Sequence, residues 1–356
     1  MSSTGIFGKN RLVSKLAVAG AVALLTLGGL NLPVQAQDAP QLPGTVVIGD
    51  LNAPRGVAFD AAGNLLVAVA GTGGEAEVSV PSTEGDGTMQ TFKTGLSGQV
   101  LSVAADGTAK PVIAGLPSYA GATETIGVYR AIPHGDSLWI VTSSAMPGLF
   151  WADSVVELDA KTLRVKNFIS PGDYEETNNP DGNEIDSNVT DLAWTADGTL
   201  LITDAGGNSM YSWTKEAGLA VVASWPDNSV PTSVEVAANG DIYVGFLGAG
   251  LAPGAGKVER WADGKLAETF AGLNAVSDIL LDGDTLYAVQ LVLFTEQGPG
   301  PGSVVKVDAS GATPVAEGIP APFAIAKGPD GALYVSFGTI AFAPGMTGGV
   351  LKLEAK

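Results

Sequence analysis

Cysteine is absent from the 356-residue sequence, and histidine occurs only once, as His134. The lack of cysteine excludes disulfide bonds, thiolate metal sites and cysteine nucleophiles. Small secreted domains often depend on disulfides, but a chain of this length buries enough surface to be stable without them. His134 falls in a short turn, away from the long loops that would form a pocket. We therefore expect neither a Ser-His-Asp triad nor a histidine metal site.

Positive charge is also scarce. Lys and Arg together number 18 against 37 Asp and Glu, which gives a formal net charge of −19. Such a surface repels nucleic acid and anionic lipid, so neither is expected as a partner. The acidic surface is compatible with two alternatives: the solubility of an exported protein, or the binding of cations and cationic ligands.

The first 36 residues have the features of a signal peptide. Three basic residues, Lys9, Arg11 and Lys15, precede the apolar run 16–32, and Val34-Gln35-Ala36 offers a cleavage site. An uncleaved membrane anchor is the alternative, but the run contains glycines and is at the short limit for a spanning helix. Cleavage removes three positive and no negative charges, which moves the formal net charge from −19 to −22.

Residues 37–356 are then expected to form one domain, exported to the periplasm or the extracellular space and free of the membrane after cleavage. Helical periodicity is missing after residue 36. Six segments share another pattern, in which an apolar strand, a glycine-containing turn and a second apolar strand follow one another. The segments are 54–69, 129–142, 190–205, 232–246, 277–290 and 323–337, with turn glycines Gly63, Gly135, Gly198, Gly240, Gly283 and Gly331.

A second half with two further strands follows most copies, as in residues 100–117 and 257–274. Four strands per unit of about 40–50 residues is typical of a β-propeller. The sequence therefore predicts an all-β fold, a six-bladed β-propeller. A β-sandwich would not explain the sixfold recurrence.

The two ends of the mature chain complement each other. The last unit stops at residues 350–356, before its fourth strand, and residues 45–52 match the strand that is missing. We therefore expect residues 45–50 to form the outer strand of the last blade. An N-terminal strand that completes the last blade would close the ring and leave no open edge.

Variation in loop length is confined to one face of the predicted ring. The turns between the first and second strands of each unit are short, and we call the face that carries them the short-turn face. The opposite, long-loop face would carry any binding site. Its insertions are residues 71–98, 117–127, 143–153, 171–187, 247–256, 291–302 and 338–347.

Alignment on the turn glycines brings polar residues to equivalent positions where the innermost strands begin. Two readings are open: a cluster at the tunnel mouth that grips a small ligand or ion, or a set of ion pairs and hydrogen bonds that fills the tunnel. The candidate ligand-binding residues are Arg55, Tyr129, Arg130, Asp191, Thr232 and Asp278.

The densest polar stretch, residues 173–188, leads into the third unit. The fold would bring Asp186, Asn188, Asp204 and Asn208 together on the long-loop face. Oxygen donors of this kind suit Ca²⁺, which makes them candidate metal ligands. Asn and Asp are also common turn residues, and structural hydrogen bonding is the alternative.

With these repeats, the chain resembles the ScyD/ScyE family of exported proteins. The segments that carry the resemblance are 51–74, 174–188, 199–213 and 230–245, and it spans essentially the whole mature chain. Family members often have Pro-His-Asp at the start of the second blade, where this sequence has Val128-Tyr129-Arg130. The resemblance implies export and an NHL-like propeller, and it implies no settled activity.

Two functions follow from these features. The first is a binding or scaffold protein that takes a small molecule, an ion or a protein partner on its long-loop face. The second is a calcium-dependent, lactonase-like hydrolase with Asp204, Asn188 and Asp186 as metal ligands. The sequence leaves open whether the chain is an enzyme, because fold alone does not fix function.

Overall fold

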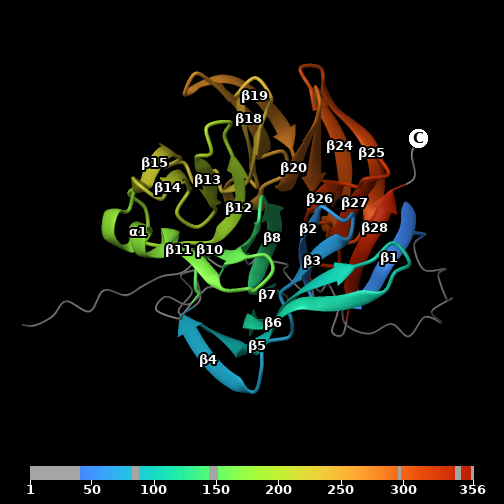
Figure 1. Ribbon diagram of the computed structural model, residues 1–356. Coiled ribbons are helices and arrows are strands. Elements are labelled where there is room, and N and C mark those ends of the chain that lie inside the picture. Colours follow the sequence, from blue (N-terminus) through green and yellow to red (C-terminus); the bar gives the residue numbers. More distant parts are fainter. Residues whose placement is uncertain are drawn as a thin grey trace, which may run out of the picture.

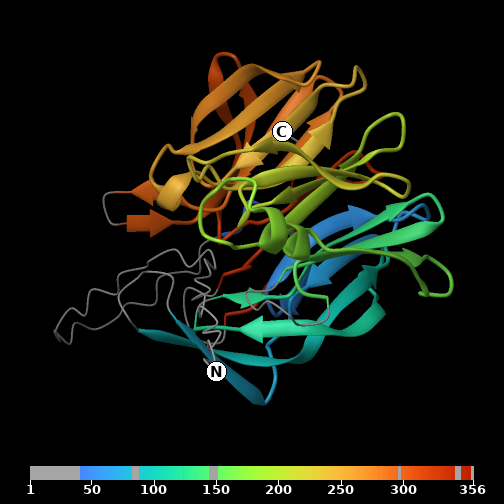
Figure 2. The ribbon, with the colours of Figure 1, turned by 90° about the vertical axis from the view of Figure 1, so that its left-hand side faces the viewer.

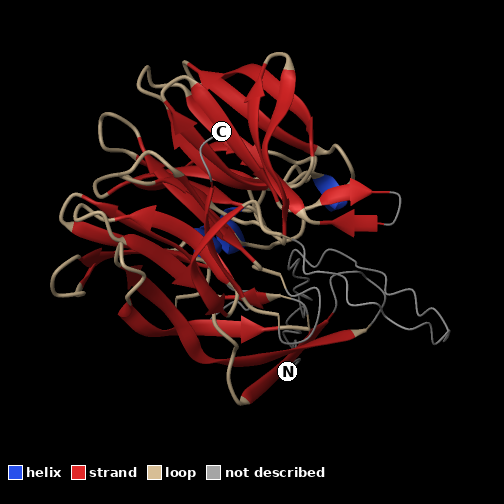
Figure 3. Cartoon of the chain, turned by 90° about the vertical axis from the view of Figure 1, so that its right-hand side faces the viewer, coloured by secondary structure: helices blue, strands red, loops and turns tan. Residues whose placement is uncertain are grey.

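The computed structural model describes residues 41–81, 88–122, 124–143, 151–295, 298–340 and 346–353. The predicted signal peptide, residues 1–36, lies outside this part of the chain. The described residues are mostly strands, with the short helix α1 (Pro171–Asn178) and the 3-10 turn η1 (Ala249–Leu251) (Figure 3). The all-β class is confirmed. None of the helices described here is long and apolar enough to cross a membrane.

Within the described residues, the strands form six larger antiparallel sheets and one two-stranded sheet. The first sheet has the order β2 (Pro54–Phe59), β3 (Leu65–Val69), β5 (Met89–Val103), β6 (Ala109–Ala120), β7 (Thr125–Ile126), with β4 (Ala76–Pro81) paired to β5. The second is β8 (Val128–His134), β9 (Ser137–Thr142), β10 (Ser154–Asp159), β11 (Val165–Ile169). The third is β12 (Val189–Trp194), β13 (Leu200–Asp204), β14 (Ser209–Thr214), β15 (Gly218–Ser224).

The remaining sheets repeat this up-and-down order. The fourth is β16 (Pro231–Val236), β17 (Ile242–Phe246), β18 (Gly256–Ala262), β19 (Lys265–Leu273). The fifth is β20 (Val276–Asp282), β21 (Thr285–Gln290), β24 (Gly302–Asp308), β25 (Gly311–Ile319). The hairpin β22 (Leu293–Thr295) and β23 (Gly298–Gly300) is inserted between β21 and β24.

The sixth sheet combines the two ends of the described chain. Its order is β26 (Ile325–Lys327), β27 (Leu333–Phe337), β28 (Gly348–Leu353), β1 (Gly44–Leu51). The strand expected over residues 45–50 is thus β1, and it pairs antiparallel with β28, with Thr45 opposite Lys352 and Ile48 opposite Val350. β1 satisfies backbone groups along the outer edge of β28, where an unpaired strand would invite association.

The first strand of each sheet lies beside the first strand of the next sheet. Contacts join β2 to β8, β8 to β12, β12 to β16, β16 to β20, β20 to β26, and β26 back to β2. Figure 1 shows these strands towards the centre of the molecule, with β15, β19, β25 and β1 at its periphery. Apolar residues fill the space between neighbouring sheets. Between the first and second sheets, the buried residues include Ala68, Val100, Val128 and Ile140.

Glycine and aspartate explain the short turns between first and second strands. Gly63 has φ of +83°, a conformation that side chains disfavour, and Gly198 has φ of +85°. The Asp60 side chain accepts hydrogen bonds from the backbone N–H groups of Ala62 and Asn64, which fixes the turn after β2. The glycine-turn pattern of the sequence therefore predicts these hairpins correctly.

The first insertion differs from its prediction. Residues 71–98 were expected as a loop, but they contain β4 and the first part of β5, which pair as a long hairpin. Figures 1 and 2 show this hairpin extending from the edge of the first sheet. Ser79 and Thr91 are hydrogen-bonded across it at 2.8 Å between their hydroxyl oxygens, and Phe92 is buried at its base.

The insertion at residues 171–187 contains α1, which the sequence did not reveal. The Ser170 hydroxyl accepts a hydrogen bond from the Asp173 N–H at 3.3 Å, and Pro171 occupies the first turn. Asn179 ends the helix in the left-handed region, with φ of +42°, and donates its N–H to the Glu175 carbonyl. The helix has no apolar stripe, so periodicity could not have indicated it.

Candidate functional site

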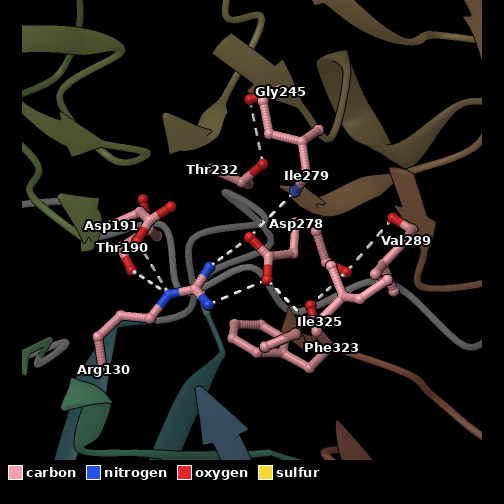
Figure 4. Close-up of polar contacts among 12 residues, drawn as sticks. Arg130, Thr190, Asp191, Thr232, Gly245, Asp278, Ile279, Val289, Phe323 and Ile325 are labelled. Carbon is pink, nitrogen blue, oxygen red and sulfur yellow. Dashed lines mark hydrogen bonds and ion pairs between the residues drawn. The ribbon is translucent and has the colours of Figure 1, made fainter. Parts of the chain in front are cut away.

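Arg130 lies at the centre of a buried ion cluster between the inner strands. Its Nη2 and Nη1 lie 2.7 and 3.0 Å from the two carboxylate oxygens of Asp278, and its Nε lies 3.1 Å from Asp191 Oδ1. Figure 4 shows the guanidinium of β8 facing carboxylates from β12 and β20. Paired geometry of this kind is the strong form of a charge-assisted hydrogen bond.

The same carboxylates also accept backbone hydrogen bonds from other sheets. Asp191 Oδ2 accepts the N–H of Val234 in β16 at 3.1 Å, and Asp278 Oδ2 accepts the N–H of Ile325 in β26 at 2.8 Å. In β2 the position equivalent to Arg130 is Gly56. A Cβ there would lie 2.8 Å from Arg130 Cδ, so glycine leaves room for the arginine. The cluster thus involves all six inner strands.

Burial dominates the electrostatics of this cluster. Loss of solvent raises the pKa of Asp191 to about 7, although the neighbouring Arg130 charge acts in the opposite direction. The pKa of Arg130 is raised above its ordinary value, because the charges of Asp191 and Asp278 outweigh the cost of its own burial. Arg130 therefore stays charged, and Asp191 can hold a proton near neutral pH.

Arg55 forms a second buried layer next to this cluster. Its Nη2 donates to Glu124 Oε1 at 2.7 Å and to the Thr125 carbonyl at 2.6 Å. Its guanidinium lies 4.7 Å from the ring centre of Tyr129 and 4.8 Å from that of Phe323, which are cation–π contacts. Burial raises the pKa of Tyr129 to about 12, so its phenol stays neutral.

Thr232 belongs to neither layer. Its hydroxyl oxygen lies 2.7 Å from the Val276 carbonyl of the next sheet and 3.1 Å from the Gly245 carbonyl. The hydroxyl of Ser277, at the equivalent position, likewise donates to the Phe323 carbonyl at 2.8 Å. These hydroxyls link the starts of neighbouring inner strands rather than facing an open space.

The structure therefore brings the six predicted ligand-binding residues into one ion cluster, one aromatic layer and one junction between sheets. All six side chains are buried and have partners. This arrangement corresponds to the filled tunnel that the sequence left open as an alternative. Whether any of these residues binds a ligand stays a prediction.

A cavity of about 450 Å³ lies on the other side of the ion cluster, towards the short-turn face. Arg130, Asp191 and Asp278 form its floor, and the later residues of the inner strands form its walls. The wall residues are Val57, Ala58, Ile132, His134, Leu192, Ala193, Trp194, Val234, Glu235, Val236, Ile279, Leu280, Ile325, Ala326 and Lys327. This volume lies within the range of small-molecule sites.

Residues at the ends of the inner strands surround the mouth of this cavity. His134, the last residue of β8, stacks on Trp194, the last residue of β12, with ring centres 3.9 Å apart and planes 9° apart. Lys327 at the end of β26 pairs with Asp282 at 2.6 Å. His134 is on the short-turn face as expected, but it lines a cavity there, which the sequence analysis did not foresee.

Glu235 is a functional candidate that the sequence analysis missed. It lies on the cavity wall two residues after Ser233, the position equivalent to Arg130, Asp191 and Asp278. Burial, with the nearby Asp191 and Asp278 charges, raises its pKa to about 8. Strand alternation was the available signal, since residues i and i+2 face the same way.

The four predicted calcium ligands are already hydrogen-bonded to protein groups. Asp204 accepts the N–H groups of Asn188 at 2.7 Å and Gly207 at 3.0 Å, and the Ser187 hydroxyl at 2.6 Å. Asn208 Oδ1 accepts the Val230 N–H at 3.0 Å.

The other two have partners as well. Asn188 Oδ1 accepts the Ser143 hydroxyl, and Asp186 Oδ1 accepts the N–H of Ser187 at 2.9 Å. Over the described ranges, no group of three or more His, Cys, Asp or Glu side chains is arranged to hold a metal ion. The oxygens that would bind Ca²⁺ point at protein donors, so this arrangement fits structural hydrogen bonding better than a metal site.

Comparison with known proteins bears on the fold. No protein-family model matches the sequence, and no curated protein matches it either. Among solved structures, a glucose dehydrogenase-type oxidoreductase from Thermus thermophilus is similar over 88% of this chain and 100% of its own, with a TM-score of 0.55 and 15% identity. The chain is a β-propeller. At this level of identity, the similarity shows the fold of the propeller and nothing about its chemistry.

Two further solved structures have lower scores. Virginiamycin B lyase from Staphylococcus aureus matches with a TM-score of 0.47 and 12% identity, over 86% of each chain. A gluconolactonase from Xanthomonas campestris matches with a TM-score of 0.46 and 13% identity, over 88% of this chain and 99% of its own. Neither similarity bears on the activity of this propeller.

Removal of divalent cations is expected to leave the melting temperature of the propeller unchanged to within about 1 °C. The reason is that protein donors already satisfy the Asp204 and Asn208 oxygens. A cation present at about 100 times its Kd would stabilise the fold by about 2.7 kcal/mol, which a melting curve detects easily. The measurement compares melting in EDTA, in Ca²⁺ and in Mg²⁺. A rise in the melting temperature that is specific to Ca²⁺ and is abolished by Asp204→Asn would support the calcium-site hypothesis.

Proposed function

We propose that this propeller is an exported binding protein whose small-molecule ligand occupies the central cavity and enters from the short-turn face. The observation that carries the proposal is the cavity itself, about 450 Å³ in volume, with residues of all six inner strands in its wall. It joins apolar walls to a few buried polar groups, the usual composition of a ligand site. The buried layer around Arg55 fills the central tunnel on the side of the long-loop face, so entry from the short-turn face is favoured.

The architecture proposed for this role is a closed six-bladed ring. The pairing of β1 with β28 and the contact of β26 with β2 support it. Membership of the ScyD/ScyE family, cleavage after Ala36 and residence in the periplasm or outside the cell are part of the same proposal. They rest on the sequence features described above. The long-loop face stays available for a protein partner.

The lactonase-like hydrolase is the weaker hypothesis. It needs a bound Ca²⁺ to polarise a carbonyl group or to activate water. The donors at Asn188, Asp204 and Asn208 are engaged with protein N–H and O–H groups, so we derive no catalytic step from them.

The test of the proposal is whether small aromatic probes enter the cavity. We expect phenethylamine or 2-phenylethanol to receive saturation transfer from the protein in ligand-observed NMR. Ala326→Leu should abolish the signal, because the larger side chain fills space in the cavity wall. Ala217→Leu, in an exposed turn, is the matched control and should keep it. If neither probe binds, or if Ala326→Leu binds as well as the control, the proposed function is wrong.

A further inference from the structure

The charges around the cavity do not balance. Asp191, Asp278 and Glu235 face it from β12, β20 and β16, and Arg130 on β8 is the one cation at their depth among the described lining residues. The Lys327 charge at the mouth is matched by Asp282 at 2.6 Å. With every group ionised, these six residues carry a formal charge of −2. The walls hold the surplus close to any bound molecule.

The Arg130 guanidinium is already committed. Two of its nitrogens pair with Asp278 and the third with Asp191. Glu235 forms no ion pair with the residues that the structure describes, and it is held by the backbone N–H of Leu281. A positive charge brought into the cavity would therefore meet Glu235 and the Asp191 carboxylate, whose oxygens already contact Arg130 and the Val234 N–H.

The pKa values of the carboxylates reflect the same excess of negative charge around the cavity. The pKa of Glu235 is raised to about 8 and that of Asp191 to about 7, in each case chiefly through burial and also through the other carboxylates. Near neutral pH the cavity therefore retains protons in place of a missing cation. A ligand cation would take over the role of those protons and release them.

The remaining wall is apolar and aromatic. Ile132, Leu280 and Ala326, each two residues after the level of the ion cluster, line the interior, and the Trp194 indole stands at the mouth. Trp194 is held in place by the His134 stack and by an edge contact with Trp139 at 5.6 Å. An indole face attracts organic cations as well as apolar groups.

We infer that the ligand of this cavity is a small organic amine, whose protonated nitrogen is bound by Glu235 and Asp191 and whose apolar body packs on the channel wall. The inference rests on the proposed function and names the chemical class of its ligand. An anionic ligand would meet buried carboxylates and a guanidinium that is already paired, and a neutral ligand would leave the surplus negative charge to be compensated by protons alone.

The affinity for an amine should rise with pH. Binding competes with the protons on Glu235 and Asp191, so the Kd should fall as the pH rises from about 6 to about 8.5, while the amine stays protonated. The other charged groups that face the site are Arg130, whose pKa is raised, Asp278 and the Lys327–Asp282 pair. His134 also lies at the mouth.

The experiment compares three probes of similar shape by isothermal titration calorimetry at low salt: phenethylamine, 2-phenylethanol and 3-phenylpropionate. We expect the amine to bind about tenfold or more tightly than the alcohol, and the carboxylate to bind least. Glu235→Gln should weaken amine binding about tenfold and leave alcohol binding unchanged. Glu317→Gln makes the same change of charge on the exposed face of β25 and should leave both unchanged.

The outcomes separate the inference from the proposed function. If amine and alcohol bind equally, and Ala326→Leu abolishes both, the cavity is a binding site and the inference is wrong. If no probe binds, the proposed function fails together with it. The pH dependence of the wild-type Kd needs no variant, so it tests the inference even if Glu235→Gln does not fold. An affinity for the amine that is independent of pH would overturn it.

Discussion

Arg130→Met is expected to lower the free energy of unfolding by about 3–5 kcal/mol. Methionine has a similar length and no charge, so it removes the partner of two buried carboxylates and leaves the packing largely intact. Asp191 and Asp278 would then face each other without compensation, at side-chain exposures of 8% and 3%. The loss is large because the same carboxylates bind backbone N–H groups of two further sheets.

Urea unfolding at constant pH measures this change. Lys352→Met is the matched control: it breaks an ion pair with Asp330 whose members are 42% and 39% exposed, and it should cost less than about 1 kcal/mol. The deficit of Arg130→Met should shrink at acid pH, where the two carboxylates can take up protons. Equal losses in both variants would mean that the buried cluster contributes no more than a surface pair.

The stability of the wild-type protein is expected to fall as the pH rises from about 5 to about 9. The main cause is Glu175, whose pKa burial and the Asp204 charge raise to about 8. The Glu175 side chain is buried, and its Oε2 lies 3.3 Å from the Tyr211 hydroxyl. Among the described residues, Oε1 has no hydrogen-bond partner. Glu235 and Asp191 have raised pKa values as well, and they act in the same direction.

The direction follows from proton linkage. Because the folded-state pKa is above the unfolded value, the folded protein holds a proton that the unfolded chain has lost between about pH 4.5 and pH 8. The stabilisation that this proton provides is fully present below the pKa of the unfolded state. It is lost as the pH rises through the pKa of the folded state. We expect Glu175 to account for about 2 kcal/mol of the decline, less than the full shift implies, because nearby dipoles and water screen its charge.

Glu175→Gln isolates this contribution, because the amide has nearly the same shape and does not titrate. The variant should lose less stability than the wild type between pH 5 and pH 9 when both are unfolded in urea across this range. Glu176→Gln is the control, since its side chain is exposed on the same helix α1. Parallel pH profiles for wild type and Glu175→Gln would show that Glu175 titrates normally.

Much of the fold could be predicted because the repeated parts obey local rules. Gly63 and Gly198 require a left-handed backbone, and each marks a hairpin between two apolar strands. The insertions could not be predicted in this way. The β4–β5 hairpin depends on pairing within an insertion that lies outside the repeated pattern, and α1 depends on the Ser170 and Asn179 caps rather than on a stripe.

The candidate site could be predicted in position but not in its connections. Alignment brought Arg130, Asp191 and Asp278 to one level of the channel, since equivalent positions of a repeat face its axis. It could not show that Arg130 reaches across the channel to Asp278, because that depends on the room left by Gly56. The burial of Glu175 could not be predicted either, because it comes from the tertiary packing around α1.

The pairing of β1 with β28 has a consequence for how this protein matures. Residues 44–51 find their partner about 300 positions later in the chain, so the sheet that contains both cannot form until residues 348–353 have been synthesised. β1 therefore lacks the strand with which it pairs until residues 348–353 are present. A product that ends before residue 348 lacks this partner altogether, so its sixth sheet cannot be completed.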